Sequence, residues 1–152
     1  IVMNLRLLAA ALAVSAGLGW FGVPTMAQNT KQNTNVFKGR LSKVPVDAKM
    51  LPIIIGIGQA TGTLNGSRVT IAGTFEGLGS PATVARLHEA KYIGVHGPVI
   101  AELEVTKAAT GTVSGQVNLT PEQVNSLKAG KLYVQIHSQA GPEGHLWGFL
   151  LP

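Results

Sequence analysis

Beyond residue 35 the chain alternates apolar and polar residues in short runs, which glycine, proline and asparagine interrupt. Alternation with a period of two is typical of a β-strand with one buried face. In one such run Val69, Ile71 and Phe75 fall on one face, and Thr70 and Thr74 fall on the other. The pattern therefore predicts an all-β domain around an apolar interior.

The runs predict a series of short strands separated by turn residues. They cover residues 36–44, 53–64, 67–75, 83–89, 99–106, 113–119, 131–138 and 145–151. Asn65-Gly66 predicts a tight hairpin, because both central positions of the favoured turn need a positive φ. Many short strands with frequent turns indicate a sandwich or a barrel, and the order of pairing stays open.

One short helix interrupts the strands. Thr120 is a helix-capping residue type, Pro121 suits the first turn, and Gln123 has the spacing of a capping box. Gly130 is the expected stop, because glycine readily adopts the left-handed conformation that ends helices.

The N-terminal segment is apolar over residues 7–23, and Arg6 precedes this run. A basic start, an apolar middle and small residues near the exit are typical of a secretory signal peptide, with cleavage after Ala27. The same run is long enough to be a retained transmembrane anchor. Trp20 and Phe21 would then lie at the far membrane interface and contact lipid or a partner.

These alternatives define the expected organisation of the chain. Residues 1–27 form a signal peptide or a retained hydrophobic helix, 28–35 form a polar linker, and 36–152 form the β domain. With Arg6 on the near side, a retained helix predicts a cytoplasmic N-terminus and a periplasmic domain at the cell membrane. Cleavage predicts a secreted or periplasmic protein.

Composition narrows the functional classes. Hydrophobic residues make up 45% of the chain and charged residues 12%, which excludes an intrinsically disordered chain. The chain has no cysteine, which excludes disulfides and thiolate metal sites. The net charge is +5, but the basic residues do not form a stripe with interleaved aromatics, so no nucleic-acid partner is expected.

Residues 37–151 resemble the chordin-type (CHRD) domain, a module found in chordin and in many bacterial exported proteins. The closing stretch Leu-Tyr-Val-Gln-Ile-His-Ser followed by Pro-Glu-Gly is the most specific segment. The segments that carry the resemblance are 37–41, 62–64, 69–78, 87–88, 97–100, 119–130, 132–138, 142–144 and Gly148.

This resemblance implies an antiparallel Greek-key β-sandwich, similar to immunoglobulin or superoxide dismutase domains, in an extracytoplasmic setting. It implies no catalytic activity. The sequence departs from the family pattern at Arg86, which replaces the first of two histidines, and at His145, which replaces an acidic residue. Trp147 follows that second change.

His88 and His137 are the candidate metal ligands, because two imidazoles from different strands could bind zinc or copper. A stable site needs three or four ligands, which His96, His145 or Glu89 could complete. No two histidines have a tight ligand spacing, and a structural role in hydrogen bonding to the backbone is favoured. No cofactor is therefore expected.

No catalytic set stands out in the sequence. Ser80 and Ser138 lack the strained turn of a hydrolase nucleophile. Glu102 and Glu104 share one strand face and are expected to be solvated. We therefore expect a protein that is not an enzyme.

Tyr133, Trp147 and Phe149 occupy alternating positions and are the candidate partner-binding strip, although such residues also cap cores. The leading hypothesis is a membrane-anchored periplasmic accessory subunit of a respiratory or photosynthetic type of complex. Its partners would be other protein subunits and, through the N-terminal helix, the lipid bilayer. The alternatives are a secreted soluble binding module and a metal-binding, dismutase-like protein.

Overall fold

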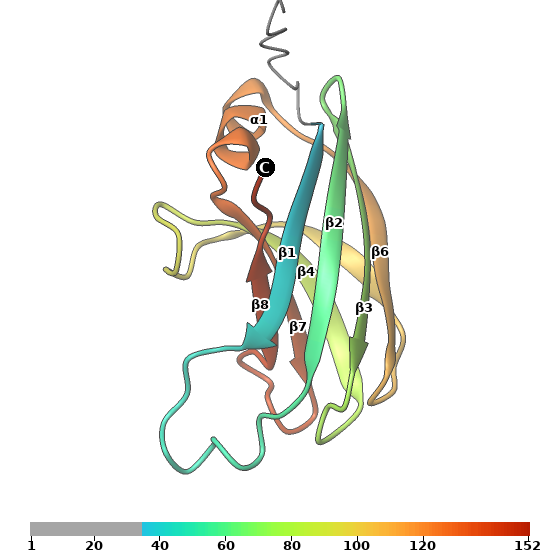
Figure 1. Cartoon of the computed structure of the whole chain (residues 1–152), viewed down its shortest axis with the longest axis vertical. Coiled ribbons are helices and arrows are strands. Elements are labelled where there is room, and N and C mark those ends of the chain that lie inside the picture. The colour runs from blue at the N-terminus through green and yellow to red at the C-terminus, as the bar shows by residue number, and fades with distance from the viewer. Residues whose placement is uncertain (1–34) are drawn as a thin grey trace, which may run out of the picture. The chain divides into compact units, whose positions relative to one another are not determined.

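The computed structural model describes residues 35–152, which form an antiparallel β-barrel with one short helix (Figure 1). The elements are β1 Val36–Lys43, β2 Ile57–Asn65, β3 Arg68–Glu76, β4 Ala82–Glu89, β5 Val99–Val105, β6 Gly111–Asn118, α1 Pro121–Lys128, β7 Leu132–Ser138 and β8 Leu146–Phe149. The all-β prediction is confirmed. The predictions for the N-terminal helix, including Trp20 and Phe21, and for the linker lie outside the described residues.

The strands close in the order β1-β2-β3-β6-β5-β4-β7-β8. The expectation of two separate sandwich sheets needs correction, because short ladders of two residue pairs join the sheets at β1–β8 and at β5–β6. Glycines allow the close approach of β1 to β8. A Cβ on Gly39 would lie 2.7 Å from the carbonyl oxygen of Phe149, so a larger residue would push these strands apart.

The interior is filled by the apolar face that the alternation predicts. Val69, Ile71 and Phe75 of β3 are buried, and so are Leu132 and Val134 of β7. These side chains belong to one continuous cluster that includes residues of all eight strands. Removing them from water is the main force that holds the barrel together.

The predicted strand 53–64 begins later than expected. Residues 53–56 belong to the long β1–β2 loop (residues 44–56), and β2 starts at Ile57. The amides of Ile53 and Ile54 both donate to the carbonyl of Met50, and Gly56 has a φ of 109°. These local bonds turn the backbone, and the run of isoleucines therefore forms a loop despite its high strand propensity.

The hairpin and helix signals are confirmed. Gly66 has a φ of 61° in the β2–β3 turn. The Thr120 hydroxyl accepts from the Gln123 amide, and the Gln123 side chain accepts from the Thr120 amide. Gly130 follows the helix with a φ of 70°. Among residues 35–152, no helix is long and apolar enough to cross a membrane.

The two sides of the barrel differ in what covers their outer faces. The outward residues of β3, such as Thr70 and Thr74, are exposed. Every residue of β7 is buried, including the outward-facing Tyr133, Gln135 and His137. The outer face around β7 is therefore covered by loops, and its buried polar side chains make it the candidate site.

Candidate functional site

The outer face of β4, β7 and β8 brings together the polar and aromatic residues that the sequence singles out. The strand register places His88 of β4 beside Tyr133 of β7, and Tyr133 beside Phe149 of β8. In the next outward row Gln135 stands beside Trp147. His88 and His137 therefore lie on neighbouring strands of one sheet, and not on opposite sheets.

The aromatic side chains form one cluster around Tyr133. Its ring lies 4.8 Å from the His88 ring, 4.9 Å from Phe149 and 5.5 Å from Trp147, between ring centroids. The exposed His96 ring stacks on Trp147 at 4.8 Å. Tyr133 is fully buried, whereas Trp147 and Phe149 are half-buried. The prediction that Tyr133, Trp147 and Phe149 bind a partner stays a prediction, and the Tyr133 ring packs against the rings of the other two.

The β4–β5 loop (residues 90–98) covers one end of this face. The Nδ1 atom of His88 lies 2.9 Å from the carbonyl oxygen of Gly97, and the Gly97 amide donates to the Tyr133 hydroxyl at 3.0 Å. A Cβ at Gly97 would collide with the carbonyl of Glu89. Only glycine allows the loop to lie this close to the strand.

The β7–β8 loop (residues 139–145) covers the middle of the face. His137 Nδ1 lies 2.8 Å from the carbonyl oxygen of Pro142, and Gln135 Nε2 donates to the carbonyl of Glu143 at 3.0 Å. Outward polar side chains of β7 thus bind the backbone of the loop that buries them. These bonds satisfy groups that would otherwise be costly to remove from water.

The β1–β2 loop is held by a third histidine. His145 is fully buried, and its Nε2 atom lies 2.6 Å from the carbonyl oxygen of Ile55. Its Nδ1 atom lies 2.6 Å from the hydroxyl of Ser138. Three buried histidines therefore each bind the backbone of a different loop.

The tautomers of these histidines follow from their partners. A carbonyl oxygen only accepts, so the ring nitrogen facing it carries the proton. His88 and His137 are therefore protonated at Nδ1, and His145 is protonated at Nε2, which leaves its Nδ1 to accept from Ser138. The burial of His88 and His145 lowers the pKa of each imidazole, partly opposed by the backbone hydrogen bonds to Gly97 and Ile55.

The candidate metal ligands His88 and His137 have a suitable tautomer, but too few further ligand side chains lie near them within residues 35–152. The Nε2 atoms of His88 and His137 are buried without a hydrogen-bond partner, and a histidine ligand typically donates its other nitrogen to a carbonyl as these do. Within residues 35–152, however, no three His, Cys, Asp or Glu side chains converge as a metal would require. Arg86 and His96 also lie near enough to His88 to lower its pKa through charge repulsion.

Ser138 and His145 form a pair that the sequence did not single out. Their separation of 2.6 Å is that of a nucleophile and its base. Both side chains are buried, and the Ser138 hydroxyl already accepts from the Gly141 amide and from the Ser80 hydroxyl. A substrate has no path to Ser138 in this arrangement, so the pair acts as a structural bridge between loops.

The model of the CHRD domain matches residues 22–150, which is most of the chain. The chain belongs to the CHRD family. The resemblance carried by the closing stretch and the other segments is thereby confirmed. Comparison with curated proteins and with solved structures finds no significant match.

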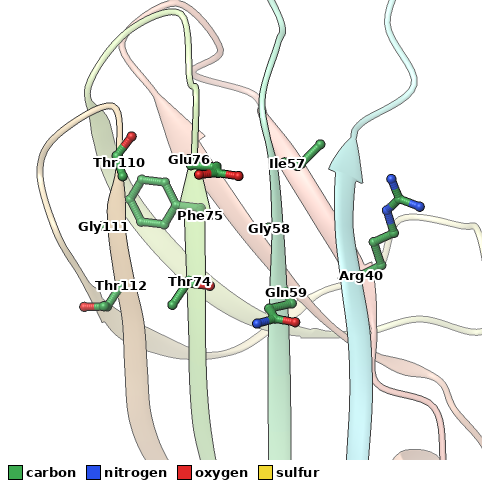
Figure 2. Close-up of a pocket in the computed structure, with 10 residues that line it drawn as sticks. All are labelled: Arg40, Ile57, Gly58, Gln59, Thr74, Phe75, Glu76, Thr110, Gly111 and Thr112. Carbon is green, nitrogen blue, oxygen red and sulfur yellow. The ribbon is translucent and has the colours of Figure 1, made fainter.

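The CHRD barrel also carries a groove on its uncovered side. It has a volume of about 440 Å³ and crosses β1, β2, β3 and β6 (Figure 2). Arg40 and Glu76 are its charged residues, and β2 lies between their strands. The polar side chains that line it come from separate strands and do not converge on one point (Figure 2).

Exposed apolar residues gather in two regions. We call Leu51, Ile53 and Ile55 of the β1–β2 loop, together with Ile57 at the start of β2, the loop patch; these side chains are 51%, 44%, 42% and 49% exposed. The β4–β5 region carries a second set, formed by Tyr92, Ile93, Val95 and Val99. The sequence did not predict the loop patch, because Ile53 and Ile55 were expected to belong to the strand that begins only at Ile57. The flanking prolines and Gly56 were the available signal.

Proposed function

We propose that the chain is a non-enzymatic accessory subunit of a membrane protein complex, which docks onto a neighbouring subunit through the loop patch. In this proposal residues 7–23 form an N-terminal hydrophobic helix that holds the barrel on the periplasmic side of the membrane. The observation that supports it is a loop that exposes three aliphatic side chains, next to a fourth at the start of β2, and that is hydrogen-bonded to the barrel.

The exposure of the loop patch is unusual for a free surface. Single exposed aliphatic residues are common, but several large apolar side chains exposed close together are typical of an interaction site. Leu51, Pro52, Ile53 and Ile55 are exposed, whereas Ile54 is fully buried. The loop therefore has an inner anchor and an outer apolar face.

The loop is ordered by specific bonds, which lowers the entropy lost on docking. The Asp47 carboxylate accepts from the amides of Lys49 and Met50, and the Asp47 carbonyl accepts from Met50 and Leu51. At the other end of the loop His145 binds the Ile55 carbonyl. The loop patch is thus presented in one conformation.

The β1–β2 loop and Val36 lie at opposite ends of β1. β1 runs the length of the barrel from Val36, and the β1–β2 loop extends from the opposite end (Figure 1). Eight residues of strand span about 25 Å. A chain held through residues ahead of Val36 can therefore present the loop patch away from its point of attachment.

Site-specific photo-crosslinking tests the proposal. The full chain is expressed in its native host with a photoreactive phenylalanine analogue at Leu51 or Ile53, and at Thr74 of the uncovered face as a control. We expect one defined protein adduct from the two loop positions and none from Thr74. Equal adducts from all three positions, or none from the loop, would refute docking through the loop patch.

A pair of matched variants locates the surface. Leu51→Asp with Ile53→Asp should abolish co-isolation of the partner in mild detergent, whereas Tyr92→Asp with Ile93→Asp, on the second exposed loop, should leave it intact. Mass spectrometry of the native N-terminus separates a retained helix from a secreted form. A start near residue 28 would contradict membrane anchoring and leave the docking surface standing.

A further inference from the structure

We propose that His145 is a pH-sensitive latch: protonation of its ring releases the β1–β2 loop from the barrel and so weakens docking. The latch rests on the geometry of His145 alone. Its consequence for docking rests on the proposed function.

His145 and Ser138 belong to a hydrogen-bond network that joins four separate segments. Its Nε2–H donates to Ile55 of the β1–β2 loop, and its Nδ1 accepts from Ser138 at the end of β7. The Ser138 hydroxyl also accepts from Ser80 of the β3–β4 loop, at 3.1 Å between oxygens. Ser80 in turn accepts from the Ala140 amide at 2.8 Å.

The donors and acceptors of this network match the neutral ring of His145 and not the protonated ring. The hydroxyl proton of Ser138 is directed at His145 Nδ1, while the Ser138 oxygen accepts from Ser80 and from the Gly141 amide. A protonated His145 would direct a second N–H at Ser138, whose own proton would then have no acceptor. The Ser138 bridge must therefore rearrange when the ring takes up a proton.

Within residues 35–152, no carboxylate is hydrogen-bonded to the His145 ring to compensate a positive charge on it. The titratable and charged residues of the elements packed against it are Lys38, Arg40 and Lys43 of β1, Asp47 and Lys49 of the β1–β2 loop, Tyr133 and His137 of β7 and Glu143 of the β7–β8 loop. In the described part of the chain, the groups bonded to the His145 ring are the Ile55 carbonyl and the Ser138 hydroxyl. The Asp47 carboxylate caps its own turn. An unpaired buried cation is strongly unfavourable.

Lower pH is expected to favour the open β1–β2 loop. Burial lowers the pKa of His145 below the value of 6.5 for a free imidazole, and the bond to Ile55 opposes this only in part. The released loop exposes His145, whose pKa then returns towards 6.5. The closed loop is therefore favoured fully above that pH, and the advantage is lost as the pH falls below it.

The easiest way to relieve the buried charge is to open the β1–β2 loop. This loop crosses from β1 to β2 outside the barrel (Figure 1), and only Val44 and Ile54 of it are buried. Local opening of a segment with few buried side chains costs less than global unfolding. The loop patch, carried on this segment, would then lose its fixed conformation.

Hydrogen exchange of the full chain in mild detergent tests the latch. Peptides covering residues 44–56 are followed at about pH 7.5 and about pH 5, with rates corrected for the intrinsic pH dependence. We expect protection in this segment to fall at least tenfold at the lower pH, while the β2–β3 strands change little. Unchanged protection of 44–56 would overturn the latch.

His145→Gln is the matched variant, because glutamine retains an N–H donor for Ile55 and does not titrate. It should keep the loop protected at both pH values, whereas His88→Gln should leave the wild-type response of 44–56 in place. If His145→Gln does not fold, an NMR titration of wild-type His145 decides. An apparent pKa at or above 6.5 would refute the latch.

Crosslinking at Leu51 over the same pH range separates the two proposals. Loss of both protection and adduct at low pH supports the latch and its link to docking. Loss of protection with an unchanged adduct leaves the latch standing and refutes its link to docking. An absent adduct at both pH values refutes docking through the loop patch and does not affect the exchange result.

Discussion

The two sides of the barrel use the same strand pattern for different purposes. On β3 the outward residues Thr70 and Thr74 face solvent, and the strand is buried on one face only. On β7 the outward residues Tyr133 and Gln135 are as buried as the inward ones. Alternation therefore identifies the face of a strand that joins the core, whereas the loops determine whether the opposite face is buried or exposed.

The largest difference is expected from side-chain truncation on the two outer faces. Tyr133→Ala should lower the free energy of unfolding by about 3–5 kcal/mol, as for a core aromatic residue, because the ring is fully buried among other rings. Thr74→Ala on the uncovered face should change it by less than about 0.5 kcal/mol. Denaturant unfolding of both variants measures this difference. Similar losses of stability for the two variants would refute the burial of the outer face of β7.

A second prediction concerns how closely the β4–β5 loop packs against the strands that it covers. Gly97→Ala should destabilise the protein by about 1–3 kcal/mol, because the new methyl group would collide with the backbone of Glu89. Gly115→Ala on the other side should have a smaller effect, since its nearest neighbour is the movable end of the Leu103 side chain at 2.7 Å. Thermal or denaturant unfolding compares them, and an equal or larger loss for Gly115→Ala would contradict the account.

A third prediction contrasts polar contacts on the two faces. Gln135→Met removes a buried bond to the Glu143 carbonyl and should cost about 1 kcal/mol. Arg68→Met removes an exposed bond to Asn118, at 3.2 Å, and should cost less than about 0.5 kcal/mol. The measurement is again the free energy of unfolding. A larger loss of stability for Arg68→Met than for Gln135→Met would mean that the β7–β8 loop does not exclude water from the outer face of β7.

The fourth and most gradual effect is that of pH. Burial first, then the charges of His137, Arg86 and His96, lower the pKa of His88, against a hydrogen bond to Gly97 that raises it. The unfolded chain therefore binds this proton more readily, and stability should decline as the pH falls below 6.5. His88→Gln should flatten the decline. An unchanged profile in this variant would contradict the buried state of His88.

Much of the barrel was predictable, because period-two alternation and turn residues are local signals. The face of β3 formed by Val69, Ile71 and Phe75, the Gly66 turn and the Thr120 cap all follow from such signals. Closure into a barrel did not follow, since it depends on contacts between β1 and β8 that are distant in sequence.

The site was only partly predictable for the same reason. The sequence identified His88, His137 and Tyr133 as notable and favoured backbone hydrogen bonds for the two histidines, but it did not indicate which loops bury them. The role of His145 depends on the position of Ile55, which is far away in the chain. High strand propensity also disguised residues 53–56 as part of a strand, where local hydrogen bonds form a loop.

The most direct test of the covered face is a long-range proton–nitrogen NMR spectrum of the histidine rings in the full chain. The account predicts that His88 and His137 carry their proton on Nδ1 and His145 on Nε2, because each faces a loop carbonyl. Ring signals averaged between both tautomers, as in a solvent-exposed imidazole, would contradict it.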